Sequence, residues 1–200
     1  MTKSASSAIL ADIGATNARF ALLAGDDIGV PTTYAVADYD SPIDAVRAFL
    51  AGPAADHKPD RALFAAAGPV VNGRVTMTNA AWTVDAKRIR QRLGLKDVRV
   101  LNDFEALGWA LPALQSEDLF RVGDGTPLER GTMAVMGPGT GFGLSAIAFG
   151  ADSETMLVTE GGHATLPSEN RREDAIILAL REQVHHVSVE RVLSGPGLVQ

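Results

Sequence analysis

AILADIGATNARFALL, residues 8–23, consists of two apolar runs joined by a short turn of glycine and polar residues. The first run, Ala8–Ala11, predicts a buried strand, and Ala18–Leu23 predicts a second strand that returns beside it. Gly14–Asn17 then forms the turn of a hairpin. Because helical and strand patterns continue to alternate along the rest of the chain, we expect a layered α/β fold.

The remaining periodicity predicts further strands and helices in alternation. Apolar runs predict strands at residues 32–36, 62–67, 74–78, 98–101, 132–136, 142–149 and 155–159. Apolar residues at helical spacing predict helices at residues 42–50, 85–93, 104–114 and 171–184, and a short helix after residue 188. Ser41, Asn170 and Ser188 stand at N-cap positions, and Pro112 is expected to end or kink the third helix.

The composition is that of a globular chain without cysteine. Of its 200 residues, 46% are hydrophobic and 21% are charged, and the formal net charge is −6. The lack of cysteine excludes disulfides and thiolate metal sites, which fits a reducing compartment. The first seven residues are polar, are expected to fray, and lack the apolar run of a signal peptide. No apolar stretch has membrane-spanning length, so we expect no membrane partner and a cytoplasmic protein.

Three arginines form the densest basic cluster. Arg88, Arg90 and Arg92 lie on one predicted helix, where their spacing spreads them around its exposed side. This arrangement indicates a solvated face, and we expect no nucleic-acid partner.

The turn of the first hairpin has the character of a phosphate loop. Gly14 allows a tight turn and close approach to a ligand, and Thr16 and Asn17 supply a hydroxyl and an amide. Asp12 could hold Mg²⁺ through water, because Mg²⁺ favours oxygen ligands and keeps several waters. The alternative is a plain hairpin turn of turn-favoured residues.

A second glycine-rich segment, GPGTGFG at residues 137–143, lies between two predicted strands. Four glycines in seven residues are costly unless the backbone needs the freedom, which indicates a second phosphate loop around Gly139 and Thr140. A flexible hairpin is the alternative. The spacing is not that of a dinucleotide-binding loop, and the chain has no Gly-Lys pair of a Walker loop.

Asn102 and Asp103 follow a buried apolar run. Both residue types favour helix N-caps, so capping explains at least one of them. A carboxylate at the end of a buried strand is also partly desolvated, and Asp103 could then accept a proton from a substrate hydroxyl.

Glu160 and His163 are separated by two glycines. This spacing lets the backbone fold so that both side chains face one ligand. Hydrogen bonding to substrate hydroxyls is one interpretation, and zinc is the competing one, although two ligands without cysteine make a poor zinc site.

These segments together resemble the bacterial glucokinase family in its non-ROK branch, within the actin/hexokinase/Hsp70-like superfamily. The similarity runs from end to end of the chain and keeps the order of the family. The matching pieces are LADIGATNARFAL at 10–22, MTNAAW at 77–82, LNDFEALGWALPAL at 101–114, GPGTGFG at 137–143, EGGHATLP at 160–167 and ERVLSGPGLV at 190–199.

The resemblance implies an actin/hexokinase-like (ribonuclease H-like) α/β fold with a small domain at residues 1–105 and an incomplete large domain at residues 106–200. It implies ATP-dependent phosphorylation of glucose at its 6-hydroxyl, with ATP and Mg²⁺ as cofactors and a homodimer as the complete protein. Asp103 matches the catalytic base. The groups that match sugar ligands are Asn102, Asp103, Glu160, His163 and Glu190, and those that match the phosphate and Mg²⁺ environment are Asp12, Gly14, Thr16, Gly139 and Thr140.

Two departures from the family pattern are visible. Ala15 replaces a glycine in the first phosphate motif, and the chain stops at Gln200, before the expected adenosine-binding segment. We therefore expect little or no turnover from these 200 residues alone. The ROK branch is disfavoured because it carries a cysteine-rich zinc motif. A non-catalytic module that binds sugar or phosphate, and a kinase for another hexose, are the alternatives.

Overall fold

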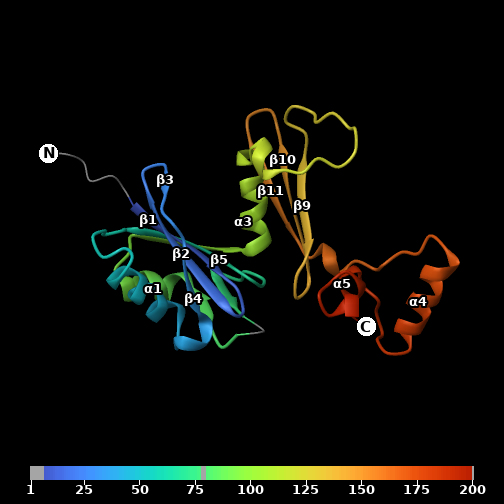
Figure 1. Ribbon diagram of the computed structural model, residues 1–200, viewed down its shortest axis with the longest axis horizontal. Helices are drawn as coiled ribbons and strands as arrows, with labels where there is room; N and C mark the ends of the chain where they lie inside the picture. Colours follow the sequence, from blue (N-terminus) through green and yellow to red (C-terminus); the bar gives the residue numbers. More distant parts are fainter. Residues whose placement is uncertain (1–6, 78–79, 200) are drawn as a thin grey trace. The chain divides into compact units, whose positions relative to one another are not determined.

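The computed structural model describes residues 7–77 and 80–199, which divide into two units, Met1–Ala106 and Leu107–Gln200 (Figure 1). We call them unit 1 and unit 2 and describe each by itself. The expected fraying of the N-terminus falls on residues 1–6, outside the described residues, and so do Thr78 and Asn79 of the MTNAAW segment.

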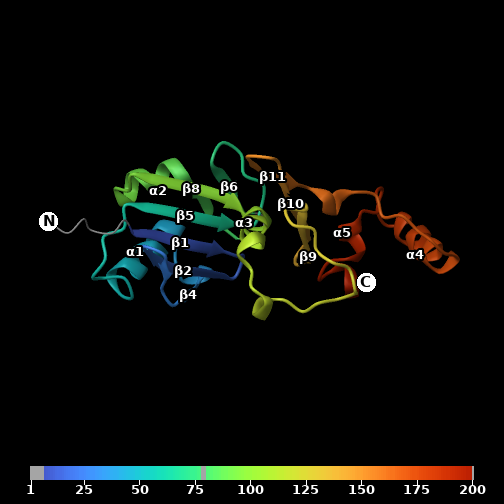
Figure 2. The ribbon, with the colours of Figure 1, turned by 90° about the horizontal axis from the view of Figure 1, so that it is seen from above.

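Unit 1 is built on a six-stranded sheet in which β1, β5 and β8 run parallel and β2 returns antiparallel to β1 (Figure 2). The order is β3-β2-β1-β5-β8, with β4 also paired to β2. The hairpin predicted from residues 8–23 is therefore confirmed. The strands are β1 Ser7–Ile13, β2 Asn17–Ala24, β3 Asp27–Ile28, β4 Thr32–Ala35, β5 Arg61–Ala66 and β8 Asp97–Asn102.

Two helices, α1 (Pro42–Ala51) and α2 (Ala86–Leu93), close the core of unit 1. Alternate residues of the strands enter this core, and Phe20 and Phe64 are fully buried. Ile89 is the buried residue of α2, while its arginines face solvent as predicted. Each helix in unit 1 therefore exposes a polar face and buries an apolar one.

The ends of these helices follow the local sequence. The Ser41 hydroxyl accepts the backbone N–H of Asp44, and the Asp85 carboxylate accepts that of Arg88 at 2.9 Å. Gly94 ends α2 in the left-handed region, with φ of 68°, where glycine carries no steric penalty. Asp85 also closes a short hairpin, β6 (Arg74–Thr76) with β7 (Thr83–Asp85), whose second strand is too short to be predicted from alternation.

Unit 2 contains a three-stranded antiparallel sheet, β11-β10-β9, formed by β9 (Met133–Pro138), β10 (Phe142–Phe149) and β11 (Glu154–Thr159). The sequence predicts a strand at each of these places, and β9 ends at Pro138, two residues beyond its predicted end. The second half of α3 (Asp103–Ala110), which belongs to unit 2, lies beside this sheet (Figure 1). A side chain at Gly108 would clash with Ser145 and Met156, so glycine permits this close approach.

The helical segments of unit 2 are shorter than their apolar periodicity suggests. α3 stops at Ala110 and a 3₁₀ turn follows, because Pro112 lacks the N–H that continues a helix. α4 (Arg171–Arg181) ends three residues earlier than predicted, and the N–H groups of Gln183 and Val184 both donate to the carbonyl of Leu180 just beyond it. The remaining helical pieces of unit 2 are α5 (Val189–Val192) and the 3₁₀ turns η2 Leu111–Ala113, η3 Ser116–Asp118, η4 Gly161–His163 and η5 Gly197–Val199, while η1 Val36–Asp38 is a 3₁₀ turn of unit 1.

The N-caps of α4 and α5 differ from each other. Asn170 accepts the N–H groups of Arg172 and Glu173, as predicted. Ser188 stands at the N-cap of α5, but its side chain forms no capping hydrogen bond. In the described part of the chain, none of the helices has both the length and the apolar character needed to cross a membrane.

Candidate active site

The carboxyl ends of the parallel strands of unit 1 meet at one edge of the sheet. In the register of the sheet, Ile13 lies beside Ala66, and Ala66 lies beside Asn102. The turn Gly14–Asn17 and the carboxylate of Asp103 both follow directly from this row. Ligands of open α/β sheets commonly bind at such an edge, so these groups have the right placement for a shared site.

The turn Gly14–Asn17 is tight and anchored at both ends. Gly14 N–H donates to the Asn17 carbonyl at 2.9 Å, and the Thr16 carbonyl accepts Val36 N–H at 2.9 Å. A Cβ at Gly14 would lie 3.3 Å from the Asn17 carbonyl oxygen, so glycine fits here with least adjustment. The turn therefore presents a fixed backbone beside Asp12.

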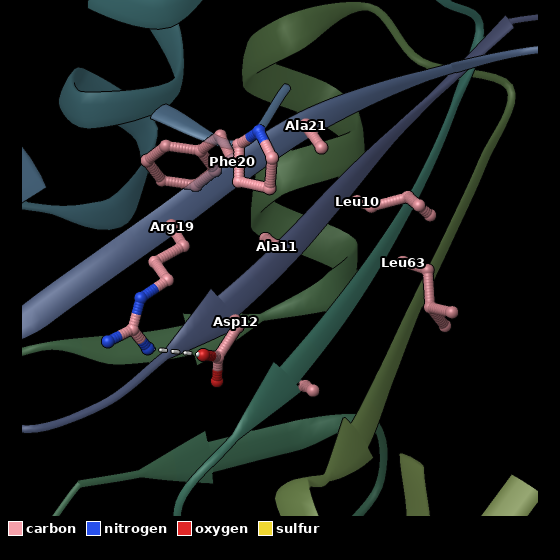
Figure 3. Close-up of a pocket in the computed structure, with 9 residues that line it drawn as sticks. Leu10, Ala11, Asp12, Arg19, Phe20, Ala21 and Leu63 are labelled. Atoms are coloured by element: carbon pink, nitrogen blue, oxygen red, sulfur yellow. Dashed lines mark hydrogen bonds and ion pairs between the residues drawn. The ribbon is translucent and has the colours of Figure 1, made fainter. Parts of the chain in front are cut away.

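Asp12 forms an ion pair that sequence reasoning did not assign. Nη1 of Arg19 donates to Oδ2 of Asp12 at 2.8 Å, and the two residues are direct partners in the β1–β2 register (Figure 3). Both side chains are more than half exposed. The spacing of seven residues across a hairpin is the signal that could have predicted the pair.

The Asp12 carboxylate fits a water-mediated contact with Mg²⁺. It is exposed, it has one oxygen free of the Arg19 bond, and carboxylate oxygen is the ligand type that Mg²⁺ prefers. Among the described residues, no group of three or more His, Cys, Asp or Glu side chains is positioned to hold a metal ion.

The pocket drawn in Figure 3 lies on the open face of the sheet of unit 1, and we do not assign it as the substrate pocket. Its volume is about 290 Å³, and Leu10, Ala21 and Leu63 are among the apolar residues that line it. Asp12 and Arg19 are its charged lining residues, while Asp103 does not line it. A pocket with so few polar groups is a poor match for a polyhydroxylated ligand.

Asn102 caps α3, as predicted from the preference of asparagine for helix N-caps. Its Oδ1 accepts the N–H groups of Phe104 at 2.9 Å and Glu105 at 3.2 Å, and its Nδ2 donates to the Gly68 carbonyl at 3.0 Å. Glu105 reaches back to the N–H of Asn102. The Asn102 side chain also hydrogen-bonds to Asp103, so it links the start of α3 to that carboxylate.

Asp103 has the electrostatic character of a base. Burial raises the pKa of Asp103 above its ordinary value. The N–H of Phe104 and other hydrogen bonds oppose this rise, and the charge of Asp12 adds a smaller increase. The bond from the Phe104 N–H to Oδ1 measures 3.0 Å. A carboxylate with a raised pKa holds a transferred proton more readily, which is what a general base in a kinase requires.

In unit 2, the second glycine-rich segment forms a turn of three residues, Gly139–Gly141, which we call the β9–β10 turn. Gly139 N–H donates to the Gly141 carbonyl at 2.8 Å, and Thr140 is exposed at the tip. β9 extends further into this segment than predicted and ends at Pro138. A proline is tolerated there because β9 is an edge strand, where a missing N–H can be accommodated.

Glu160 directly precedes the 3₁₀ turn η4, and His163 is its last residue. Their side chains are exposed and face each other, with His163 Nε2 at 3.8 Å from Glu160 Oε2. The hydroxyl of Thr159 fixes the start of this turn, because it donates to the Leu144 carbonyl at 2.8 Å and accepts Gly161 N–H at 3.1 Å. Two polar side chains held at this separation can contact neighbouring hydroxyls of one ligand.

Glu190 lies in the same unit and is tied to the β9–β10 turn. Its Oε2 accepts the backbone N–H of Phe142 at 2.9 Å. The role expected for Glu190 was a sugar contact, and sequence reasoning missed its link to the glycine-rich segment because 48 residues separate the partners.

The predicted site residues therefore fall into two groups, one in each unit. Unit 1 contains Asp12, Gly14, Thr16, Asn17, Asn102 and Asp103, and unit 2 contains Gly139, Thr140, Glu160, His163 and Glu190.

Comparison with known proteins gives a consistent result. Residues 9–200 match the glucokinase family. Glucokinase of Paramagnetospirillum magneticum is 44% identical over 193 residues, which cover 96% of this chain and 60% of that protein. The crystal structure of glucokinase from an Antarctic psychrotroph has a TM-score of 0.86 and 37% identity, and the match covers 96% of this chain and 62% of that one.

A more distant structure supports the fold. Glucokinase from Balamuthia mandrillaris, solved in complex with glucose, has a TM-score of 0.71 at 22% identity, and the match covers 98% of this chain and 61% of that one. The chain has the actin/hexokinase-like α/β fold of these sugar kinases and spans about 60% of the length of the curated relative described above.

Proposed function

Because the chain belongs to the glucokinase family, we propose that its complete protein transfers the γ-phosphoryl group of ATP to the 6-hydroxyl of glucose. The observation that carries this proposal is Asp103. Its carboxylate ends a parallel strand, it has a raised pKa caused by burial, and it shares a sheet edge with the turn Gly14–Asn17. A base for a hydroxyl beside a phosphate-binding turn is the pairing that phosphoryl transfer needs.

In the proposed reaction, Asp103 accepts the proton of the 6-hydroxyl as that oxygen bonds to the γ-phosphorus. The bond between the γ-phosphorus and the bridging oxygen breaks, and ADP leaves with the electron pair. Asn102, Glu160, His163 and Glu190 orient the sugar by hydrogen bonds to its hydroxyls. Glucose in the Balamuthia mandrillaris structure supports this acceptor.

The phosphates of ATP are proposed to contact two glycine-containing turns. The first is Gly14–Asn17, including the Thr16 hydroxyl and the Asn17 amide, and the second is the β9–β10 turn with Gly139 and Thr140. Asp12 would hold Mg²⁺ through water, and the metal supplies neutralisation of phosphate charge when bound. Arg19 keeps the Asp12 carboxylate oriented.

The domain assignment is part of the same proposal. Residues 1–105 form the small domain and residues 106–200 belong to a larger one, which the division of the chain after Ala106 supports. We infer a homodimeric, cytoplasmic enzyme from the family resemblance, and light scattering of the complete protein tests the oligomeric state. Since this chain spans about 60% of its curated relative, turnover is assigned to the complete protein.

The decisive experiment measures glucose-dependent ADP formation by the complete protein and by its Asp103→Ala variant. We expect the variant to lose at least about 10²- to 10⁴-fold in kcat, which is the usual contribution of a general base, with glucose affinity largely retained. Asp97→Asn, at an exposed position of the preceding strand β8, is the matched control. Near-normal kcat in Asp103→Ala removes the base assignment.

The same assay separates the alternatives. Glucose binding without ATP consumption by the complete protein would identify a binding module. Faster turnover with another hexose would keep the mechanism and change the acceptor.

A further inference from the structure

The β9–β10 turn is supported from outside by the segment that contains Glu190. The Glu190 carboxylate accepts the N–H of Phe142, the first residue after the turn, at 2.9 Å. A Cβ at Gly141 would overlap this carboxylate, so the carboxylate occupies the space of a missing side chain. Glu190 therefore fits closely under one end of the turn.

The other end of the turn is held by the same segment. Gly195 N–H donates to the Gly139 carbonyl at 2.8 Å. Ser194, which precedes Gly195, is 4% exposed, and its hydroxyl accepts the N–H of Gly197 at 3.1 Å. Because both ends of the turn are bonded to residues 190–195, this segment sets the geometry of the turn.

Phe142 also connects the β9–β10 turn with the 3₁₀ turn η4. A Cβ at Gly162 would overlap the carbonyl group of Phe142, so η4 packs directly on that carbonyl. The N–H of Phe142 contacts Glu190, and its carbonyl contacts the residue before His163. The proposed sugar ligands of unit 2 thus lie around one residue of the strand that carries the proposed phosphate turn.

The Glu190 carboxylate can bond to the turn and to a sugar hydroxyl at the same time. Its Oε2 is engaged by Phe142, while a carboxylate has two oxygens and about four acceptor sites. Oε1 can therefore accept a sugar hydroxyl without loss of the bond to the turn. The glycines of the turn make such a support necessary, because glycine loses the most backbone entropy when it is ordered.

On this basis we propose that Glu190 is a positioning residue for the phosphate-binding turn as well as a sugar ligand, and that it couples sugar binding to nucleotide binding. The inference rests on the proposed function and adds a second role to one of its residues. Sugar bound at Oε1 restrains the Glu190 side chain, and the restrained carboxylate holds the β9–β10 turn in its phosphate-binding form. By thermodynamic linkage, nucleotide bound at the turn must favour sugar to the same degree.

The test measures the affinity of the complete protein for a non-hydrolysable ATP analogue by calorimetry, without sugar. We expect Glu190→Ala to weaken this affinity by about tenfold, the scale of one lost hydrogen bond to a charged group. Glu190→Gln keeps an acceptor oxygen at the same reach and should stay within about twofold of the unsubstituted protein. Glu160→Ala, which removes a sugar ligand that has no bond to the turn, is the matched control and should leave analogue affinity unchanged.

A second measurement repeats the titrations with saturating glucose. In the unsubstituted protein glucose should tighten analogue binding, and Glu190→Ala should abolish this effect. If Glu190→Ala does not fold, Glu190→Asp replaces it, because its carboxylate is one methylene short of Phe142 N–H and should show the same loss.

The outcomes distinguish this inference from the proposed function. Analogue affinity that is unchanged in Glu190→Ala, with glucose affinity lost, makes Glu190 a sugar ligand alone and overturns the coupling. Absence of both analogue and glucose binding in the unsubstituted protein overturns the proposed function and the coupling with it.

Discussion

Unit 1 closes a hydrophobic core over its sheet, whereas unit 2 leaves many of its apolar side chains exposed. In unit 1, Phe64 is 0% exposed and Trp82 is 2% exposed. In unit 2, Phe120 is 92% exposed and Val122 is 89% exposed. The apolar residues of unit 2 that do become buried are Ile147, Ile177 and Val187.

The difference indicates that local contacts fix the turns of unit 2, whereas unit 1 is also stabilised by a packed core. Unit 2 holds its turns by backbone hydrogen bonds and by close approaches at glycines, such as Gly141 and Gly162. Exposed apolar surface on this scale marks an interface or an unfilled core, and the chain spans 60% of its Paramagnetospirillum relative. Unit 1 has both local hydrogen bonds and a packed core, so it should depend less on residues outside this chain.

The largest effect should come from one substitution made in each unit. Phe64→Ala empties a fully buried site and should lower the free energy of unfolding by about 3–5 kcal/mol, whereas Phe120→Ala should change it by less than about 0.5 kcal/mol. Urea unfolding followed by tryptophan fluorescence and by circular dichroism measures the loss in each variant. Equal losses at the two positions would show that Phe120 is buried in solution.

Helix capping should have the same effect in both units. Asn102→Ala removes the cap of α3 and Asn170→Ala removes the cap of α4, and each should cost about 1 kcal/mol. Urea denaturation of the two variants checks the equality. A much smaller loss at Asn170 would mean that α4 is only marginally formed in solution.

In unit 1, partial burial of the Asp103 carboxylate disfavours its charged form. The raised pKa means that the folded state favours the protonated form, so stability present below the unfolded pKa is lost as pH rises through the folded pKa. Asp103→Asn stays neutral and can still accept the Phe104 N–H. Its free energy of unfolding should therefore exceed that of the unsubstituted chain at neutral pH.

The pH dependence of this difference is its critical check. It should disappear below the ordinary carboxyl value of 3.8, where Asp103 is protonated in both states. Urea denaturation across a pH series measures it, with Asp97→Asn, at an exposed position of β8, as the control. A difference that persists at low pH would assign the effect to packing.

Exposed ion pairs should have the smallest effect on stability in either unit. Arg19→Ala breaks the pair with Asp12, and Glu160→Gln breaks the pair with His163, and each should change the free energy of unfolding by at most about 1 kcal/mol. Thermal unfolding of both variants measures the change. A large loss of catalysis or ligand binding in either variant would then be functional, while a large loss of stability would contradict the exposed geometry.

Most secondary structure was predictable because local patterns decide it. The hairpin of residues 8–23 and the cap of α1 at Ser41 follow from apolar runs and capping residues. The strand Thr83–Asp85 was missed, since three residues are too few to show alternation. The C-terminal end of α4 was missed because a turn converging on Leu180 overrides the apolar periodicity.

The candidate site was predictable by residue type but only partly by geometry. The sequence identifies Asp103 and the glycine-rich turns, because a carboxylate and glycines stand at the ends of apolar runs. The sequence does not identify the hydrogen-bond partners of the site residues. The link from Glu190 to Phe142 spans 48 residues, and the bond from Asn102 to Gly68 spans 34.

Short-range physics thus accounts for where this chain turns, which faces it buries and which residue types it places at strand ends. Apolar periodicity and capping act over a few residues, so they can be recognised in the amino-acid sequence. Burial of Asp103, the pairing of Arg19 with Asp12 and the support of the β9–β10 turn by Glu190 required the folded chain. Desolvation and long-range hydrogen bonds depend on which distant segments pack together, and tertiary contacts alone decide that.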